Sequence, residues 1–409
     1  MKKTLLLAAL VLAGTGCMAQ KANVRKARNL ALNPDNPDFA GARTAIKAAL
    51  EDETTKDQTE TWYLAGLIGY TQNKNELEKL QLGKGGKDYV LRGEAVLESY
   101  DYWLKADSMS QVPTYDKKGN PKYDTRTRKQ IAERMVEYYI HQELINYAVE
   151  MNEKKAYDKA YEAFNKYVML PDLPMMQDKK LQEKMPRDTN YYTYKYYAGR
   201  MAYQSQMYDE AMRIFGELVE GDIEAVSAGE FLYQCYIDLN DSVKANEVLD
   251  RCIQKFPAEP WFIQNRINNL VNSGSMEAAV EYLDKAIAAD PQVQYFISKG
   301  SILNLQKKFD EAVATYEQAL KVDPNNAAIY ENYGFVYTDM ANKMNDDAAY
   351  LNAKEYAKAK IEIDNTFRKA LPYFEKAYEL APDNFEYKRS LRSLYYRLGE
   401  EEKYQQLAD

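Results

Sequence analysis

Residues 293–326 read VQYFISKGSILNLQKKFDEAVATYEQALKVDPNN, and this stretch decides the fold. In each half, small and apolar residues recur three or four positions apart, as along one face of a helix: Phe296, Gly300 and Leu303, then Ala312, Tyr316 and Ala319. The polar residues 307–310 between the two halves predict a turn. Pro324 predicts the end of the second helix, because proline has no backbone N–H to donate. The stretch therefore predicts two antiparallel helices that cross closely at their small residues.

The same pattern returns along the chain with a period near 34 residues. Small residues at one position of the second helix follow one another at steps of 34, 34 and 33, namely Ala211, Ala245, Ala279 and Ala312. The prolines after the second helix step by 34 and 33, namely Pro257, Pro291 and Pro324. This period is typical of a helix–turn–helix repeat. On these residues the chain resembles the tetratricopeptide repeat (TPR) family, and the resemblance implies an all-α, right-handed superhelical solenoid of TPR units with insertions.

The regularity of the repeat varies, and this variation predicts the organisation of the chain. Residues 191–326 form the regular TPR array, and residues 327–384 form a further TPR unit with an insertion of about 24 residues. Residues 385–409 predict a C-terminal capping helix, and residues 20–190 predict a divergent N-terminal TPR region with insertions. Residues 171–189 contain three prolines and a cluster of charges, which favours a joint there in an otherwise continuous superhelix.

One insertion of the N-terminal region has the pattern of a small β-hairpin. In residues 112–123, the turn-forming stretch DKKGNP lies between two short β-prone flanks. A mobile loop is the alternative, and the sequence leaves both open.

Residues 1–19 have the pattern of a secretory signal peptide. Two lysines near the start precede an apolar run, residues 5–13, that is too short to span a bilayer. Residues 17–19, Cys-Met-Ala, place small side chains where signal peptidase reads them, which favours an exported, soluble periplasmic protein beginning at Gln20. The alternative is lipidation of Cys17 and an anchor in the outer membrane, although the preceding Gly-Thr-Gly lacks the usual leucine.

Charge and cysteine content limit the classes of partner. The chain carries a net charge of −8, which argues against nucleic acid as a partner because that ligand requires basic stripes. The same acidity argues against peripheral binding to anionic lipid, so that the expected membrane contact is a lipid anchor at Cys17. Cys235 and Cys252 lie in one repeat, and an oxidising compartment permits a disulfide between them. Two buried thiols are the alternative.

No catalytic or metal-binding constellation is evident. The chain has one histidine, His141, expected at the start of a helix, and it has no Cys-x-x-Cys or His-Glu-x-x-His motif. The glycine-rich residues 83–87 lack the first glycine and the final serine or threonine of a phosphate-binding loop. We therefore expect no metal, no cofactor and no enzymatic activity.

The TPR resemblance also implies which residues face a partner. In TPR proteins, set positions of each first helix line a concave groove, and carrying this frame over gives ten residues of mixed aromatic, amide and charged type: Tyr196, Arg200, Tyr203, Glu230, Gln234, Trp261, Gln264, Asn268, Asn304 and Phe335. Asp238 and Asp339 occupy further positions of the frame. Aromatic rings together with amides suit an extended peptide, which needs both apolar contact and hydrogen bonds. The basic clamp with which cytosolic cochaperone TPRs hold a C-terminal carboxylate is absent from these positions.

The sequence thus predicts a non-enzymatic scaffold that mediates protein–protein interaction in a bacterial cell envelope, with a protein or peptide partner in its groove. A glycan-binding outer-membrane lipoprotein resembling SusD is the main alternative, since that class embeds TPR units. It would need lipidation at Cys17 and an aromatic platform in long loops. The chain has only three tryptophans, and its regular repeats leave little room for such loops.

Overall fold

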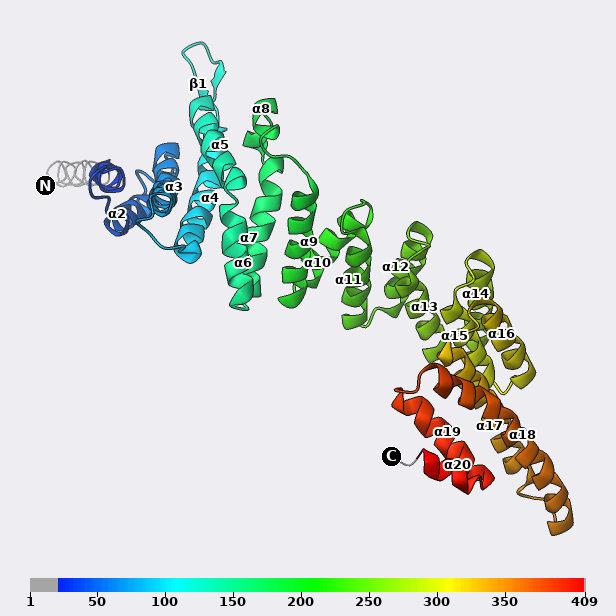
Figure 1. Ribbon diagram of the computed structural model, residues 1–409. Coiled ribbons are helices and arrows are strands. Elements are labelled where there is room, and N and C mark those ends of the chain that lie inside the picture. Colours follow the sequence, from blue (N-terminus) through cyan, green and yellow to red (C-terminus); the bar gives the residue numbers. More distant parts are fainter. Residues whose placement is uncertain (1–20, 408–409) are drawn as a thin grey trace, which may run out of the picture. The chain divides into compact units, whose positions relative to one another are not determined.

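The computed structural model describes residues 21–407, which fold as helices apart from one small hairpin (Figure 1). Residues 21–31 form the first helical segment. The chain divides into two compact units, Met1–Phe256 and Pro257–Asp409. In each unit, successive helices pair in the helix–turn–helix manner that the repeat period predicts. The expected all-α solenoid is thereby confirmed.

The first unit contains most of the helices and both strands. Its helices are α2 (Phe39–Glu51), α3 (Thr59–Gln81), α4 (Tyr89–Ser110), α5 (Thr125–Ile140), α6 (Glu143–Glu153), α7 (Tyr157–Met169), α8 (Lys179–Gln182), α9 (Thr189–Gln204), α10 (Tyr208–Val219), α11 (Ala225–Asp238) and α12 (Ser242–Lys255). Two short 3-10 helices, η1 (Leu170–Asp172) and η2 (Pro174–Met176), follow α7, and the strands are β1 (Thr114–Tyr115) and β2 (Pro121–Lys122).

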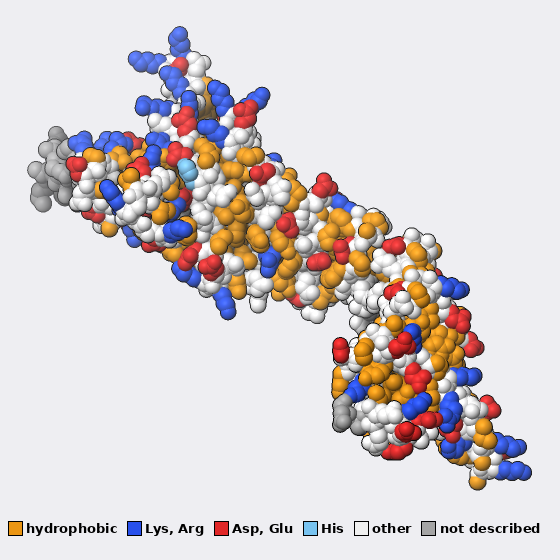
Figure 2. Space-filling view, in the orientation of Figure 1, with side chains coloured by type: hydrophobic (Ala, Val, Ile, Leu, Met, Phe, Trp, Pro, Cys, Tyr) orange, Lys and Arg blue, Asp and Glu red, His pale blue; other side chains and the backbone are white. Residues whose placement is uncertain are grey.

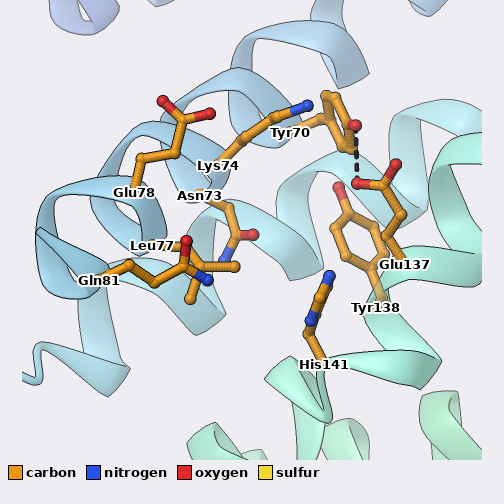
Figure 3. A pocket seen from close by; sticks show the side chains of 9 residues that line it. All are labelled: Tyr70, Asn73, Lys74, Leu77, Glu78, Gln81, Glu137, Tyr138 and His141. Carbon is orange, nitrogen blue, oxygen red and sulfur yellow. Dashed lines mark hydrogen bonds between the residues drawn. The ribbon is translucent and has the colours of Figure 1, made fainter.

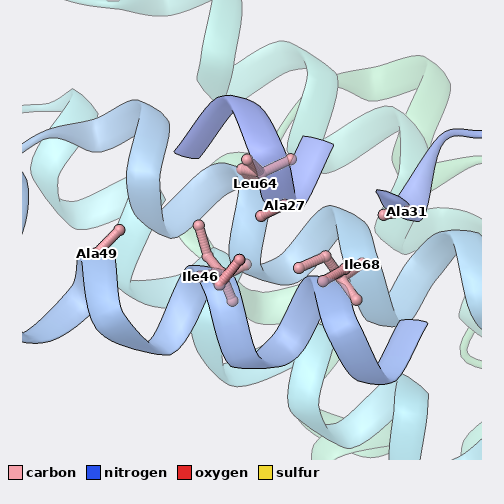
Figure 4. Packing of buried hydrophobic residues seen from close by; sticks show 9 residues of the cluster. Ala27, Ala31, Ile46, Ala49, Leu64 and Ile68 are labelled. Atoms are coloured by element: carbon pink, nitrogen blue, oxygen red, sulfur yellow. The ribbon is translucent and has the colours of Figure 1, made fainter. Parts of the chain in front are cut away.

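Small side chains allow the N-terminal helices to approach closely. Helix 21–31 packs against α2 and α3 through a buried cluster rich in alanine (Figure 4): Ala27, Ala31, Ala42, Ala45, Ile46, Ala49, Leu64, Ala65 and Ile68. Asp38 begins α2 by accepting a hydrogen bond from the backbone N–H of Gly41 at 2.8 Å, which satisfies one of the free donors of the first turn. The cluster therefore closes the N-terminal end of the described chain with a core of its own.

A glycine marks the crossing point in two of the regular helix pairs. A Cβ atom placed on Gly199 of α9 would lie 2.7 Å from the ring of Phe215 in α10, and one on Gly300 would lie 2.4 Å from the ring of Tyr316. Any larger residue would push the two backbones apart or displace the ring. The spacing of small residues in the sequence thus corresponds to close helix–helix contact.

The turn between paired helices has the same backbone in four successive repeats. One residue in each turn adopts the left-handed conformation, at steps of 34, 34 and 33 residues: Gln206 (φ 58°), Asn240 (φ 58°), Gly274 (φ 78°) and Lys307 (φ 61°). Only one of the four is glycine, although the left-handed region costs other residues roughly 1–2 kcal/mol. Helix packing on both sides of the turn holds this conformation in place.

Two irregular segments of the first unit are ordered. The expected β-hairpin is confirmed, because β1 pairs with β2 in antiparallel register, with Thr114 opposite Lys122. Residues 171–189, expected as a joint, are instead packed: Met176 and Met185 are buried, and the hydroxyl of Tyr139 in α5 donates to the carbonyl of Pro186 at 2.5 Å. The division between compact units lies at Phe256–Pro257 instead. Methionines between the prolines supply the apolar surface that anchors this segment.

The second unit continues the helix pairs and ends with two helices at its C-terminus. Its helices are α13 (Pro260–Asn272), α14 (Met276–Ala289), α15 (Val293–Leu305), α16 (Phe309–Val322), α17 (Ala327–Ala348), α18 (Ala353–Leu380), α19 (Phe385–Leu398) and α20 (Glu401–Gln406). The predicted insertion lengthens α17 and α18, which pack together along a buried seam that includes Ala341, Ile363 and Phe374. The polar residues after α19 form α20 instead of an extended tail, because Gly399 ends α19 in the left-handed conformation (φ 72°).

Two further expectations concern membranes and cysteines. None of the helices that the structure describes combines the length and the hydropathy needed to cross a bilayer. The predicted signal peptide and Cys17 lie outside the described residues.

Cys235 and Cys252 are free thiols, and both are buried. Burial raises the pKa of Cys235 to about 12 and that of Cys252 to about 11. The two thiols are thus protonated and packed within their repeat.

Candidate functional site

The predicted partner-binding residues lie on the first helix of successive pairs, five in each unit. In the first unit, α9 carries Tyr196, Arg200 and Tyr203, and α11 carries Glu230 and Gln234. All five side chains are half-buried. We call the surface formed by these helices and by their counterparts α13, α15 and α17 the first-helix face, and we describe it separately in each unit.

An aromatic cluster with one arginine forms the first-helix face of the first unit. The ring of Phe231 in α11 lies 6.0 Å from that of Tyr196 and 5.4 Å from that of Tyr203. The guanidinium of Arg200 lies 5.9 Å from the Tyr196 ring and 5.7 Å from the Phe231 ring, so that two aromatic faces hold the cation. The Nε of Arg200 is buried and has no hydrogen-bond partner among the described residues. Phe231, which the repeat frame did not select, is central to this cluster.

Hydrogen bonds join the two first helices beside this cluster. The hydroxyl of Tyr203 donates to a carboxylate oxygen of Asp238 at 2.7 Å, and Nε2 of Gln234 donates to the other oxygen of Asp238 at 2.7 Å. Burial and the bond to Asp238 raise the pKa of Tyr203 above its usual value. Part of the predicted binding set therefore holds neighbouring repeats together.

The first-helix face of the second unit is richer in amides. On α13, Nε2 of Gln264 donates to the side-chain oxygen of Asn268 at 3.1 Å, and the ring of Trp261 lies 5.2 Å from that of Phe262. On α15, Nδ2 of Asn304 donates to Asp339 of α17 at 2.6 Å. The predicted residues thus lie on one type of helix, and their amide groups bond one another in part.

A cavity of about 530 Å³ lies beside Phe335, between α17, α18 and α19. Its floor is aromatic, because the rings of Phe335 and Phe374 lie edge to face 5.2 Å apart and Phe367 lines the same cavity. Phe335 is 40 % exposed, although most large apolar side chains nearby are buried. The rim is polar and includes Asn342 and Arg397, whose guanidinium lies 4.7 Å from the Phe367 ring. The cavity therefore offers apolar contact in its depth and hydrogen-bond donors at its edge.

A second cavity of about 330 Å³ lies between α3 and α5 in the first unit (Figure 3). Figure 3 shows His141 and Tyr138 from the end of α5 beside Asn73 from α3. The hydroxyl of Tyr70 donates to Glu137 at 2.8 Å, and burial first, then this bond, raise the pKa of Tyr70. His141 does not begin a helix, as the sequence suggested, but follows the last turn of α5.

This second cavity has no arrangement typical of catalysis. The carboxylate that could orient His141 bonds Tyr70 instead, and neither tyrosine lining the cavity has a lowered pKa. Among the residues that the structure describes, no group of three His, Cys, Asp or Glu side chains could hold a metal ion. The cavity therefore gives no support to an enzymatic function.

A buried ion pair lies behind the second cavity. Arg92 and Glu143 are 3 % and 2 % exposed and bond each other directly, while Nδ2 of Asn73 donates to Glu143 at 3.2 Å. The Nε and Nη1 of Arg92 have no partner in the described part of the chain. Such a pair ties α4 to α6 because neither charge can be left alone without a large desolvation cost.

Comparison with known proteins identifies the repeats. The family model described as TPR repeat matches residues 300–340, and the one described as tetratricopeptide repeat matches residues 268–293. The chain therefore contains TPR units in its second compact unit, at the place where the sequence period is most regular.

Several curated proteins share short stretches of similarity. A U-box domain-containing protein of Oryza sativa is 31% identical over 80 residues, which cover 19% of this chain and 10% of that protein. An Hsp70-Hsp90 organizing protein of Triticum aestivum is 29% identical over 112 residues, covering 26% of this chain and 17% of that protein. The chain spans between a tenth and a fifth of the length of the curated relatives it matches.

Two solved structures illustrate the similarity to proteins of known structure. A TPR repeats protein from Bacteroides fragilis is 17% identical, with a TM-score of 0.33, and covers 63% of this chain and 98% of its own. MamA from Desulfovibrio magneticus is 18% identical, with a TM-score of 0.31, and covers 45% of this chain and 89% of its own. At this level of identity the similarity concerns the repeat fold alone.

Proposed function

We propose that this protein is a non-enzymatic TPR scaffold of the bacterial cell envelope that binds a protein or peptide partner on its first-helix face. TPR units commonly bind protein partners, and the described residues contain TPR units. Repeat arrays stack small units side by side and so present long surfaces, which suits binding better than chemistry. The proposal extends this general property to particular residues.

The observation that carries the proposal is the cavity beside Phe335. An aromatic ring that lines a cavity of about 530 Å³ and is 40 % exposed can be covered by an apolar side chain of a partner. Asn342 and Arg397 at the rim supply donors for the carbonyl groups of an extended peptide. This combination of apolar anchor and polar rim is the usual composition of a peptide-binding surface.

Photo-crosslinking tests the choice of face. A photoreactive phenylalanine analogue replaces Gln234 or Phe335 on first helices, and in matched variants it replaces the exposed Gln254 or Gln318 on second helices. We expect the first two positions to capture a partner that the other two do not. Equal capture from both sets, or capture from the second helices alone, would contradict the assignment of the face.

Affinity measurements with the captured partner test the cavity itself. We expect Phe335→Ala to weaken binding by roughly fivefold or more, because a central aromatic anchor typically contributes over 1 kcal/mol. Tyr350→Ala is the matched control, because Tyr350 is the most exposed tyrosine in the same unit and lies outside the cavity. If the partner bound both variants with equal affinity, the cavity would not be part of the binding site.

Export of the chain is a separate part of the proposal. The amino-terminal pattern supports removal of residues 1–19 and a periplasmic protein beginning at Gln20, with lipidation of Cys17 and an outer-membrane anchor as the alternative. Mass spectrometry of the protein purified from its native host distinguishes the two amino termini. A full-length chain recovered with Met1 would contradict both. An acylated Cys17 together with binding of a glycan would favour the SusD-like alternative over the protein-binding scaffold.

A further inference from the structure

The β1–β2 hairpin has a rigid tip. The carboxylate of Asp116 accepts hydrogen bonds from the backbone N–H groups of Lys118 at 2.8 Å and Asn120 at 2.9 Å. The backbone N–H of Asp116 donates to the carbonyl of Asn120 at 3.0 Å, and Gly119 provides the left-handed residue of the turn (φ 81°). These bonds give the backbone of the tip a defined conformation, in contrast to a mobile loop.

One face of the hairpin is apolar and uncovered. Side chains alternate between the two faces of a strand, and Tyr115 is paired with Pro121, so that Pro113, Tyr115, Pro121 and Tyr123 share one face. Tyr115 is 69 % exposed and Tyr123 is 50 % exposed. Lys122 points to the other face, with Thr114 opposite. The hairpin is thus amphipathic, although it is too small to have a core.

Unpaired cations lie at the tip of the hairpin, on its other face and at its base. Lys117 and Lys118 at the tip, Lys122 on β2 and Arg126 at the start of α5 form no ion pair in the described structure. By contrast, Arg128 in the next turn of α5 pairs with Asp107 at 2.7 Å. Figure 2 shows Lys and Arg side chains gathered on the projection that Figure 1 identifies as the β1–β2 hairpin.

The net negative charge of the chain does not cancel this local charge. Residues 114–126 hold four cations (Lys117, Lys118, Lys122 and Arg126) against two carboxylates (Asp116 and Asp124), a local balance of 4 − 2 = +2. Acidic groups on helices farther away than the Debye length, about 8 Å at physiological ionic strength, are largely screened at the tip. The hairpin therefore presents a positive surface on an acidic protein.

We propose that the β1–β2 hairpin docks on an anionic lipid surface, with the Tyr115–Tyr123 face in the headgroup layer and the tip lysines, Lys117 and Lys118, on the lipid phosphates. Tyrosine is enriched at the membrane interface because its ring is apolar and its hydroxyl is polar. Lysines beside such residues add attraction to anionic headgroups. An acidic protein segment would match the lysines, but it would leave the apolar face without a partner, and this favours lipid. The proposal is independent of partner binding on the first-helix face.

Vesicle binding of the chain from Gln20 onward tests this proposal without a leader or an acyl chain. The probes are vesicles of phosphatidylcholine alone and of phosphatidylcholine mixed with phosphatidylglycerol. We expect sedimentation with the anionic vesicles only, weakened by added salt. Reversing the two tip charges in Lys117→Glu/Lys118→Glu should weaken this binding by at least about tenfold, since each cation near the surface contributes. Lys354→Glu/Lys358→Glu, on the exposed start of α18, is the matched control and should bind as the unchanged protein does.

Insertion of the tyrosine face is tested with a fluorophore. In Asn120→Cys the new thiol is exposed at the tip, while Cys235 and Cys252 are buried and resist labelling. An environment-sensitive dye on that thiol should shift to shorter wavelength with anionic vesicles, and Tyr115→Ser/Tyr123→Ser should abolish the shift. Equal binding to neutral and anionic vesicles, no binding to either, or unaltered binding by the Lys117→Glu/Lys118→Glu variant would overturn the proposal. Capture of an acidic protein without vesicle binding would overturn it as well.

Discussion

Asn304 donates from its side-chain amide to Asp339 at 2.6 Å, and this bond repeats an interaction found in the other unit. There, Tyr203 donates from its hydroxyl to Asp238 at 2.7 Å. In both cases the donor and the acceptor are 35 residues apart on consecutive first helices, and the donor lies one residue before the end of its helix. The same repeat positions thus carry the same bond with different donors. On the first-helix face, these side chains couple one repeat to the next.

Double-mutant cycles should detect this coupling. We expect Tyr203→Phe to destabilise the first unit by about 1 kcal/mol, because one hydrogen bond to a half-exposed carboxylate is lost. In an Asp238→Asn background the same change should cost less, giving a coupling energy of roughly 0.5–1 kcal/mol. Urea denaturation followed by circular dichroism supplies the free energies of unfolding. Additive effects of the two substitutions would show that the bond contributes nothing to stacking.

A second prediction concerns the left-handed turn residues of the second unit, where two substitutions should change the free energy of unfolding in opposite directions. Lys307→Gly should stabilise the second unit by about 0.5–1 kcal/mol. Glycine removes the steric cost of φ 61°, but part of this gain is offset because the unfolded chain with glycine has more conformational entropy to lose on folding. Gly274→Ala places a Cβ at φ 78° and should destabilise the same unit by about 1 kcal/mol. Thermal and urea unfolding of both variants check the signs. Destabilisation by Lys307→Gly would mean that the lysine side chain, and not the backbone, matters in this turn.

Two glycines in one helix pair should respond oppositely to replacement by alanine, one substitution lowering and the other raising the free energy of unfolding. A Cβ on Gly199 would lie 2.7 Å from the ring of Phe215, so that Gly199→Ala should cost about 1–3 kcal/mol through overpacking. Gly216, in the middle of α10, has no atom within 4 Å of such a Cβ, and Gly216→Ala should stabilise by about 0.5–1 kcal/mol through helix propensity. Unfolding curves of the two variants provide the comparison. A neutral Gly199→Ala would indicate that Phe215 can move aside.

Much of the fold could be predicted, because the repeat period fixes where each helix pair begins and ends. The crossing at Gly300 and Tyr316, the long helices α17 and α18, and the β1–β2 hairpin all follow from local spacing and turn residues. The division at Phe256–Pro257 could not be predicted. Pro257 occupies the same repeat position as Pro291 and Pro324, and its neighbours show no change in composition.

The candidate site could be predicted only in part. The repeat frame selects residues by their position on a first helix, and it placed Tyr196, Tyr203 and Asn304 there correctly. Hydrogen bonds between neighbouring repeats depend on how each helix is rotated about its axis relative to the next one. The spacing of residues within one helix does not specify that rotation. The cavity beside Phe335 needs side chains from α19, which lies outside the regular array, so that no repeat pattern could indicate it.

The buried pair of Arg92 and Glu143 predicts a large penalty for removing one partner. Glu143→Gln should destabilise the first unit by about 3–5 kcal/mol, because it leaves an uncompensated guanidinium in an apolar environment. Replacing both residues, in Arg92→Met/Glu143→Leu, should recover most of that loss, since no charge then remains buried. Free energies of unfolding measured by urea denaturation test the pair. If the double variant were as unstable as the single one, these residues would stabilise the unit through the packing of their side chains and not through their charges.

Buried tyrosines should make the protein sensitive to alkali. Burial raises the pKa of Tyr161, Tyr191 and Tyr316 to about 12, compared with 10.0 for a free tyrosine. Above pH 10 the unfolded chain loses these protons while the folded chain keeps them, so the stability that each buried hydroxyl contributes is complete below pH 10. It is lost progressively as the pH rises from about 10 to about 12. Urea midpoints should therefore fall steeply in this window, together with a rise in absorbance of ionised tyrosine.

Tyr316→Phe serves as the control for this alkaline transition, because the phenyl ring keeps the packing against Gly300 but has no proton to release. Its hydroxyl lies 3.2 Å from that of Ser301, so that the variant should lose a small amount of stability at neutral pH. The fall in the stability of the second unit between about pH 10 and 12 should become shallower, since one fewer proton is linked to unfolding. A pH dependence identical to that of the unchanged protein would show that Tyr316 ionises equally well in the folded and unfolded chains.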